Sequence, residues 1–73
     1  MQLIIESTTK IVTFNGLQCR IWEGTTAGGI KVHAYIPRVG VDKNQDCSQF
    51  EAELEEQKPP SPEIEAIPLR MLI

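Results

Sequence analysis

The sequence has few cysteines and few aromatic residues, and each shortage excludes a class of protein. Its two cysteines, Cys19 and Cys47, are too few for the disulfide framework of a small secreted domain. The chain has one Trp, one Tyr and two Phe among its 73 residues. A chain of this length buries only about 60% of its unfolded surface, so we predict a thin core. Little room is left for an enclosed catalytic pocket, so we expect a protein that is not an enzyme and has no cofactor.

Positive charge is also scarce, and long apolar runs are missing. Seven Lys and Arg residues against ten Asp and Glu residues give a formal charge of -3 at pH 7, whereas nucleic-acid binders carry an excess of bases. Nucleic acid is therefore not an expected partner. There is no apolar run of about 18 residues to span a membrane, and Met1 to Glu6 lack the basic leader and apolar stretch of a signal peptide. We expect a cytoplasmic protein with reduced thiols and no membrane partner.

The charges are distributed unevenly along the chain. Residues 1–41 have a balance of +2, whereas residues 42–65 hold eight acids and two bases, a balance of -6. We predict one small domain, residues 1–73. Within it, the prolines of residues 58–62 form an extended connection that leads to a C-terminal strand.

The clearest structural signal is Asn15-Gly16, which lies between two alternating runs. A type I′ turn needs positive φ at both central residues, and Asn-Gly supplies it. The two-residue loop predicts the pairs Phe14–Leu17, Thr13–Gln18, Val12–Cys19, Ile11–Arg20, Lys10–Ile21 and Thr9–Trp22. Cys19 then lies on the more apolar face, where a free cysteine behaves as a small buried hydrophobe.

The next alternating run, residues 30–36, predicts a third strand after a loose hairpin loop at residues 24–29. If Ile21 opposes Val32, the apolar residues of all three strands share the inner face. Polar and aromatic side chains then collect on the outer face. Among them, the candidate partner-binding residues are Arg20, Trp22, Lys31, His33 and Tyr35. Trp, Tyr and Arg are the residue types enriched at protein-binding hot spots.

A short helix is predicted before the prolines. Asp46 and Ser48 are N-cap candidates, and an apolar stripe of Cys47, Phe50 and Leu54 follows at spacings of three and four. We expect this stripe, including Cys47, to pack on the inner face of the sheet. The glutamates of the helix stay in water and form a secondary candidate surface: Glu51, Glu53, Glu55 and Glu56.

Two further segments are strand candidates. Ile67, Leu69, Met71 and Ile73 alternate and predict a final strand, and Pro68 indicates that this strand lies at a sheet edge or begins just after Pro68. Residues 3–5 either continue into the first hairpin strand through a bend or pair with the C-terminal segment. The predicted fold class is therefore α+β: a small, mostly antiparallel sheet of four to five strands, a β-meander, with one short helix packed on one face.

No group of residues points to catalysis or to a metal. The local sequence marks no nucleophile and no orienting carboxylate near His33. We therefore predict that His33 is a solvent-facing strand residue beside Arg20 and Tyr35. One histidine and two separated cysteines match no zinc-ligand spacing. Residues 24–29 contain three glycines but lack the Gly-Lys-Ser/Thr ending of a phosphate-binding loop. We predict no catalytic, cofactor or metal site.

Several segments resemble short uncharacterised proteins of bacteriophage and prophage genomes. They are residues 10–24, 29–36, 50–54 and 67–70. The resemblance implies a phage context, in which small acidic domains commonly act by binding a host or virion protein. No site residue is carried over from it.

Two function classes remain open. The first is a non-enzymatic protein-binding module, a phage accessory protein that binds a host protein and modulates or inhibits it through the aromatic sheet face or the acidic helix. The second is a structural component of a virion or other assembly, in which strands such as residues 69–73 or 3–5 pair with neighbours. Self-association as a homodimer, through an edge strand or the Trp22 face, is also expected. Single-stranded nucleic acid on the aromatic and basic face is disfavoured by the net charge.

Overall fold

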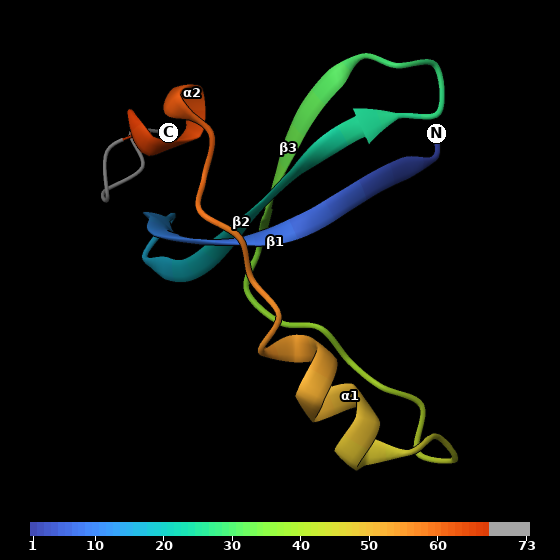
Figure 1. Cartoon of the computed structure of the whole chain (residues 1–73). Coiled ribbons are helices and arrows are strands. Elements are labelled where there is room, and N and C mark those ends of the chain that lie inside the picture. The colour runs from blue at the N-terminus through green and yellow to red at the C-terminus, as the bar shows by residue number, and fades with distance from the viewer. Residues whose placement is uncertain (68–73) are drawn as a thin grey trace.

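The structure is a computed structural model that describes residues 1–67. Its elements are β1 (Leu3–Phe14), β2 (Leu17–Thr26), β3 (Lys31–Ile36), α1 (Cys47–Leu54) and α2 (Pro62–Glu65). The strands form one antiparallel sheet in the order β1-β2-β3, with α1 and α2 on opposite sides of it (Figure 1). The α+β class is confirmed.

The predicted count of four to five strands is not supported, because residues 1–67 form three strands. Residues 3–5 continue into the first hairpin strand as part of β1, which was one of the two predicted alternatives. The predicted C-terminal strand lies outside the described residues, apart from Ile67, which is not in a strand.

The Asn15-Gly16 turn forms as predicted. Asn15 and Gly16 have φ values of 51° and 78°, the positive values that a type I′ turn needs. The four pairs nearest the turn, from Phe14–Leu17 to Ile11–Arg20, also match the prediction.

Beyond Ile11 the predicted register is wrong. Trp22 pairs with Ser7 instead of Thr9, so three residues of β1, residues 8–10, lie opposite the single residue Ile21. A bulge of this kind leaves backbone groups unpaired, and here the connection after α1 bonds to β1 within the bulge and directly before it. The Thr9 N–H donates to the Lys58 carbonyl (3.0 Å), and the Lys58 N–H donates to the Ser7 carbonyl (3.2 Å). The bulge therefore fixes the connection to the edge of β1.

The register of β3 is also wrong, by three residues. Ile21 pairs with Tyr35 instead of Val32. The reason is that β2 runs on to Thr26, through half of the predicted loop, and the turn is closed by the Thr26 N–H donating to the Ile30 carbonyl (2.9 Å). Because side chains alternate between faces, an odd shift moves every side chain of β3 to the other face.

Gly24, predicted in the loop, is inside β2 because two backbones approach closely there. A Cβ atom built on Gly24 would collide with the Ile4 carbonyl oxygen of β1. Glycine at this position therefore permits the pairing of β1 with β2 and is not a turn signal.

The small core lies between the sheet and α2. Its buried residues are Val12, Cys19, Ile21 and Ile64, with Tyr35 and Ile67 packed against them. Ile64 comes from α2, a helix that we did not predict. The start of α2 nevertheless has a sequence signal, a Ser N-cap followed by Pro at the first helical position. In the structure, the Ser61 hydroxyl accepts a hydrogen bond from the Ile64 N–H (3.4 Å). The predicted burial of Cys19 is confirmed.

Helix α1 forms where predicted but does not cover the inner face, because α2 occupies it. Asp46 caps α1: its carboxylate accepts from the N–H groups of Ser48 (3.0 Å) and Gln49 (3.2 Å). No residue of α1 is buried, and Cys47 is exposed, so the predicted packing of Cys47 against the sheet is wrong. Neither described helix is long and apolar enough to span a bilayer.

Candidate functional site

The five candidate partner-binding residues lie on two faces of the sheet and not on one. Arg20 and Trp22 are on the face toward α1, whereas Lys31, His33 and Tyr35 are on the face toward α2. The three-residue shift of β3 separates the two groups. The predicted single aromatic face is therefore wrong.

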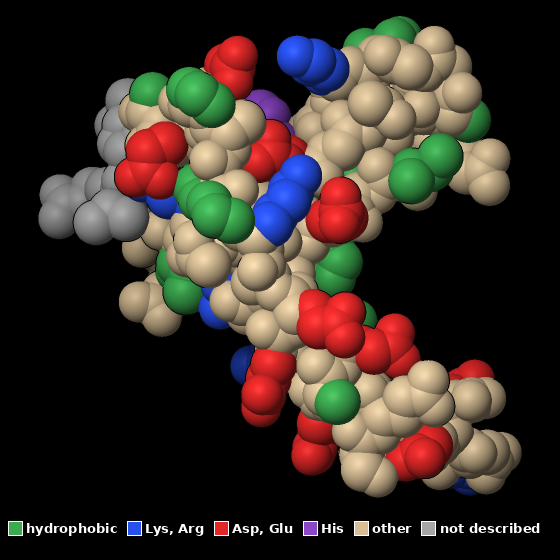
Figure 2. All heavy atoms as spheres, viewed as in Figure 1, with side chains coloured by type: hydrophobic (Ala, Val, Ile, Leu, Met, Phe, Trp, Pro, Cys, Tyr) green, Lys and Arg blue, Asp and Glu red, His purple; other side chains and the backbone are tan. Residues whose placement is uncertain are grey.

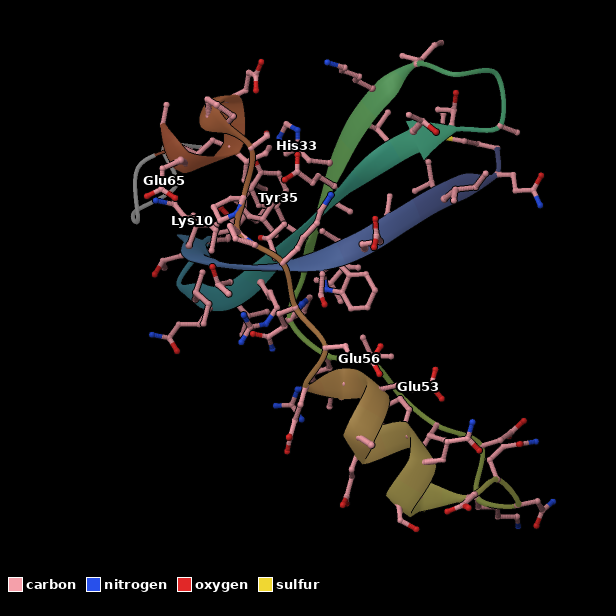
Figure 3. The ribbon with its side chains drawn as sticks, viewed as in Figure 1. Lys10, His33, Tyr35, Glu53, Glu56 and Glu65 are labelled. Carbon is pink, nitrogen blue, oxygen red and sulfur yellow. The ribbon has the colours of Figure 1, made fainter. Side chains whose placement is uncertain are left out.

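On the α2 side, Tyr35 belongs to the core edge. Its ring packs against the core and lies 5.5 Å from the ring of Phe14. Its hydroxyl is 3.0 Å from Nε2 of His33, and the two rings meet edge-on at 5.3 Å. His33 is exposed as predicted. It lies beside Tyr35, as expected, but Arg20 is on the opposite face of the sheet. Figure 3 shows both side chains on this side of the sheet.

Lys31 and His33 border a hollow of about 280 Å³ between β3 and α2. Glu23, on the wall of this hollow, accepts a hydrogen bond from the Ser61 N–H (2.8 Å). Desolvation raises the pKa of Glu23, but the hydrogen bonds from Ser61 and the charges of Lys58 and His33 outweigh it and lower the pKa. The Glu23 carboxylate therefore fixes the start of α2 to the sheet.

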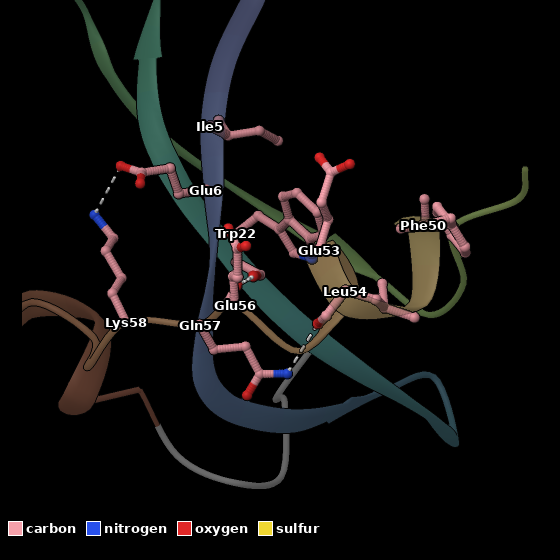
Figure 4. A pocket seen from close by; sticks show the side chains of 11 residues that line it. Ile5, Glu6, Trp22, Phe50, Glu53, Leu54, Glu56, Gln57 and Lys58 are labelled. Carbon is pink, nitrogen blue, oxygen red and sulfur yellow. Dashed lines mark hydrogen bonds and ion pairs between the residues drawn. The ribbon is translucent and has the colours of Figure 1, made fainter. Parts of the chain in front are cut away.

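On the other side, a groove of about 510 Å³ separates the sheet from α1 (Figures 2 and 4). Its apolar lining is Ile5, Trp22, Val39, Phe50 and Leu54. Its polar lining is Glu6, Ser7, Glu53, Glu56, Gln57 and Lys58. We call this the Trp22 groove. It brings the leading candidate residue, Trp22, together with Glu53 of α1 and with Glu56, which follows the helix.

The acidic charges of the Trp22 groove are not balanced. Lys58 and Glu6 form an ion pair at 3.8 Å, and no other salt bridge occurs among residues 1–67. Glu53 and Glu56 thus have no cationic partner there, and the lining of three carboxylates and one ammonium has a net charge of -2. Figures 3 and 4 show Glu53 on the side of α1 that faces the sheet. Acidic side chains gather over α1 in Figure 2.

A second hollow of about 550 Å³ adjoins the Trp22 groove and shares Trp22 and Leu54 with it. Its charged lining residues are Arg20, Arg38 and Glu55. The Arg20 guanidinium donates to the Thr8 carbonyl (2.9 Å) and is therefore fixed at the β1 bulge. Trp22 lies between an acidic hollow and a predominantly basic one.

The structure also adds residues that sequence reasoning missed. Val39 lines both hollows, but the connection between β3 and α1 carries no periodic pattern that would have marked it. The prediction that the four glutamates of α1 and its C-terminal end stay in water is confirmed, since all four are exposed. Glu51 lines neither hollow.

Residues 1–67 contain no group of three or more His, Cys, Asp and Glu side chains that could hold a metal ion. Comparisons with family models, with curated proteins and with solved structures give no match to this chain. The function is therefore inferred from the geometry of the surface around Trp22.

Proposed function

We propose that this chain is a non-enzymatic protein-binding module, a small phage or prophage accessory protein that binds a host protein in the bacterial cytoplasm and modulates or inhibits it. One observation supports the binding role above all: the Trp22 groove places a half-buried Trp next to two carboxylates without cationic partners. The phage context rests on the sequence resemblance alone.

The chemistry of the Trp22 groove favours one kind of occupant. Trp22, Phe50 and Leu54 offer apolar area to an inserted side chain, and Trp is a frequent anchor of binding energy in protein interfaces. Glu53 and Glu56 favour Lys or Arg on either side of that anchor. The expected occupant is a segment of a host protein with an apolar residue flanked by bases, and its occupation would block that segment sterically.

Affinity capture from a bacterial host lysate tests the proposal. The bait is the tagged full-length protein, compared with Trp22→Ala and with Leu17→Ala as a matched apolar control. Leu17 is 51% exposed and lies in the hairpin, outside the groove. We expect the same host protein with the wild type and Leu17→Ala, and its loss with Trp22→Ala. Equal capture by all three would contradict the proposal.

The rim charges provide a second test with the captured protein after purification. Replacing Glu53 and Glu56 together with Gln is expected to weaken binding more at low salt than at high salt, because salt screens exposed charges. Replacing Glu51 and Glu63, which do not line the groove, is the matched control. Unchanged affinity of the Glu53/Glu56 variant at low salt would exclude the acidic rim.

A second candidate function is a structural component of a virion or other assembly that acts through strand pairing. The outer edge of β3 favours it, because no described backbone group bonds there. Mass spectrometry of purified particles separates the two candidates. An assembly component is recovered in fixed proportion to the other virion proteins, whereas a host-binding factor is absent from the particles.

A further inference from the structure

The two outer edges of the sheet are closed to different degrees. The edge of β1 is interrupted by the bulge at residues 8–10, and Thr8 forms a parallel bridge with Lys58 there. The six residues of β3 pair with β2 in one unbroken register, and no backbone hydrogen bond from residues 1–67 reaches the outer side of β3. Natural sheets usually block such edges with bulges, prolines or charges. Of these features, β3 has one charged residue, Lys31.

The register also shows which backbone groups of β3 face outward. The Thr26 N–H donates to the Ile30 carbonyl, and hydrogen-bonded and non-bonded pairs alternate along an antiparallel ladder. The residues that bond to β2 are therefore Val32, Ala34 and Ile36. The residues whose N–H and C=O groups point outward are Lys31, His33 and Tyr35. This edge thus offers donors and acceptors at every second residue.

The geometry points to β3 as a site of strand addition whose occupant is a second copy of this chain. An antiparallel copy centred on His33 brings the outward groups of both strands into register, with Lys31 opposite Tyr35 of the second copy. The same register places Ile30, which is 67% exposed, opposite Ile36 of the second copy. Lys31 does not lie opposite Lys31 of the second copy, so this register brings no two lysines together.

The pairing is self-complementary, as a two-fold dimer requires. It joins two sheets of three strands into one continuous sheet and leaves β1, with its bulge, at both outer edges. The inference does not depend on the Trp22 groove, because it uses the backbone of β3. A self-paired β3 is compatible with a host-binding factor and with an assembly component.

Sedimentation equilibrium and amide hydrogen exchange of the wild-type protein, from micromolar to millimolar concentration at pH 8, test this inference. We expect a monomer–dimer equilibrium. Exchange at Lys31, His33 and Tyr35 should slow severalfold as the dimer forms, whereas Val32, Ala34 and Ile36 are protected throughout and serve as internal controls. A monomer at all concentrations, or a dimer in which the three outward amides exchange as before, would overturn it.

His33→Pro is the matching variant, because proline removes an outward N–H and is tolerated at edge positions. We expect a folded monomer by circular dichroism and sedimentation, and a dimer for the control His33→Ala, which keeps the N–H. A folded His33→Pro protein that still dimerises would overturn the inference. A dimer that is instead lost with Trp22→Ala would assign self-association to the Trp22 groove. If His33→Pro unfolds, the exchange pattern of the wild type decides whether the dimer forms through β3.

Discussion

The sheet with α2 and the segment between Ile36 and Lys58, which we call the α1 lobe, are held together in different ways. The sheet region buries Val12, Ile21 and Ile64 against one another, and its hydrogen bonds join residues far apart in sequence. Hydrogen bonds within the α1 lobe are local, such as the Asp46 cap, and no residue of its helix is buried. Its long-range hydrogen bond among the described residues, from the Ser7 hydroxyl to the Glu56 carbonyl (2.9 Å), lies at the C-terminal end of the lobe, next to Lys58. One wall of the Trp22 groove is therefore part of the cooperative fold, whereas the other opens at little cost. The proposed binding and the folding of the sheet can therefore be perturbed separately.

The largest expected effect comes from the core of the sheet region. Ile21 is fully buried, and Ile21→Ala should lower the free energy of unfolding by about 2 to 5 kcal/mol through lost burial and a cavity. Leu54→Ala, on the 43% exposed Leu54 of α1, should change it by no more than about 0.5 kcal/mol. Urea unfolding followed by circular dichroism measures both. Similar losses in the two variants would show that α1 belongs to the cooperative unit.

Two glycines, one in each region, differ in the space around them. A Cβ at Gly24 meets the Ile4 backbone, whereas a Cβ at Gly40 in the α1 lobe meets no atom within 4 Å. Gly24→Ala should therefore cost about 1 to 3 kcal/mol, because the strands must separate. Gly40→Ala should be neutral or slightly stabilising, since it reduces the entropy of the unfolded chain. Thermal unfolding of the two variants, each against the wild type, decides the matter; equal melting temperatures would contradict the close approach at Gly24.

Glu23 should make the docking of α2 sensitive to pH. Its pKa is lowered in the folded state because the Ser61 hydrogen bonds and nearby positive charges outweigh desolvation. The contribution of the ionised Glu23 to folding stability is therefore fully present above the ordinary pKa of a glutamate. It is lost as pH falls through the lowered pKa of Glu23. Urea midpoints over this acidic range should fall more steeply for the wild type than for Glu23→Gln. Parallel pH profiles would show that the Glu23–Ser61 bond does not contribute.

The smallest effect on the whole fold is expected at the cap of α1. Asp46→Ala removes the acceptor for the Ser48 and Gln49 N–H groups, so the first turn of α1 should fray while the urea midpoint stays unchanged. Asp46→Asn keeps an acceptor and is the matched control. Hydrogen bonds from Ser48 and Gln49 lower the pKa of Asp46, so the wild-type cap should weaken only as pH falls through this lowered value. Amide exchange at Ser48 and Gln49 reports the change; a shifted midpoint in Asp46→Ala would contradict the separation of the two regions.

Local signals in the sequence predicted local structure well. Asn15-Gly16 and Asp46 each act within a few residues, and both form as expected. Ser61-Pro62 was an equally local signal for α2 that the extended interpretation of the prolines obscured.

Long-range register was not readable in the same way. The β1 bulge depends on hydrogen bonds to Lys58, distant in sequence, and the shift of β3 depends on how far β2 extends. The candidate residues Trp22 and Glu53 were each identified, but in two separate surfaces. Their meeting in one groove depends on where the chain returns to the sheet, which no local pattern specifies.

The parallel bridge between Thr8 and Lys58 has a consequence for how the chain can diversify. The chain leaves the sheet at Ile36 and is fixed to it again at Lys58, so the α1 lobe is an insertion between two anchored points (Figure 1). The length, charge and helix of such an insertion can vary while the strand order and the core stay the same. One scaffold in this way carries groove walls of different length and charge.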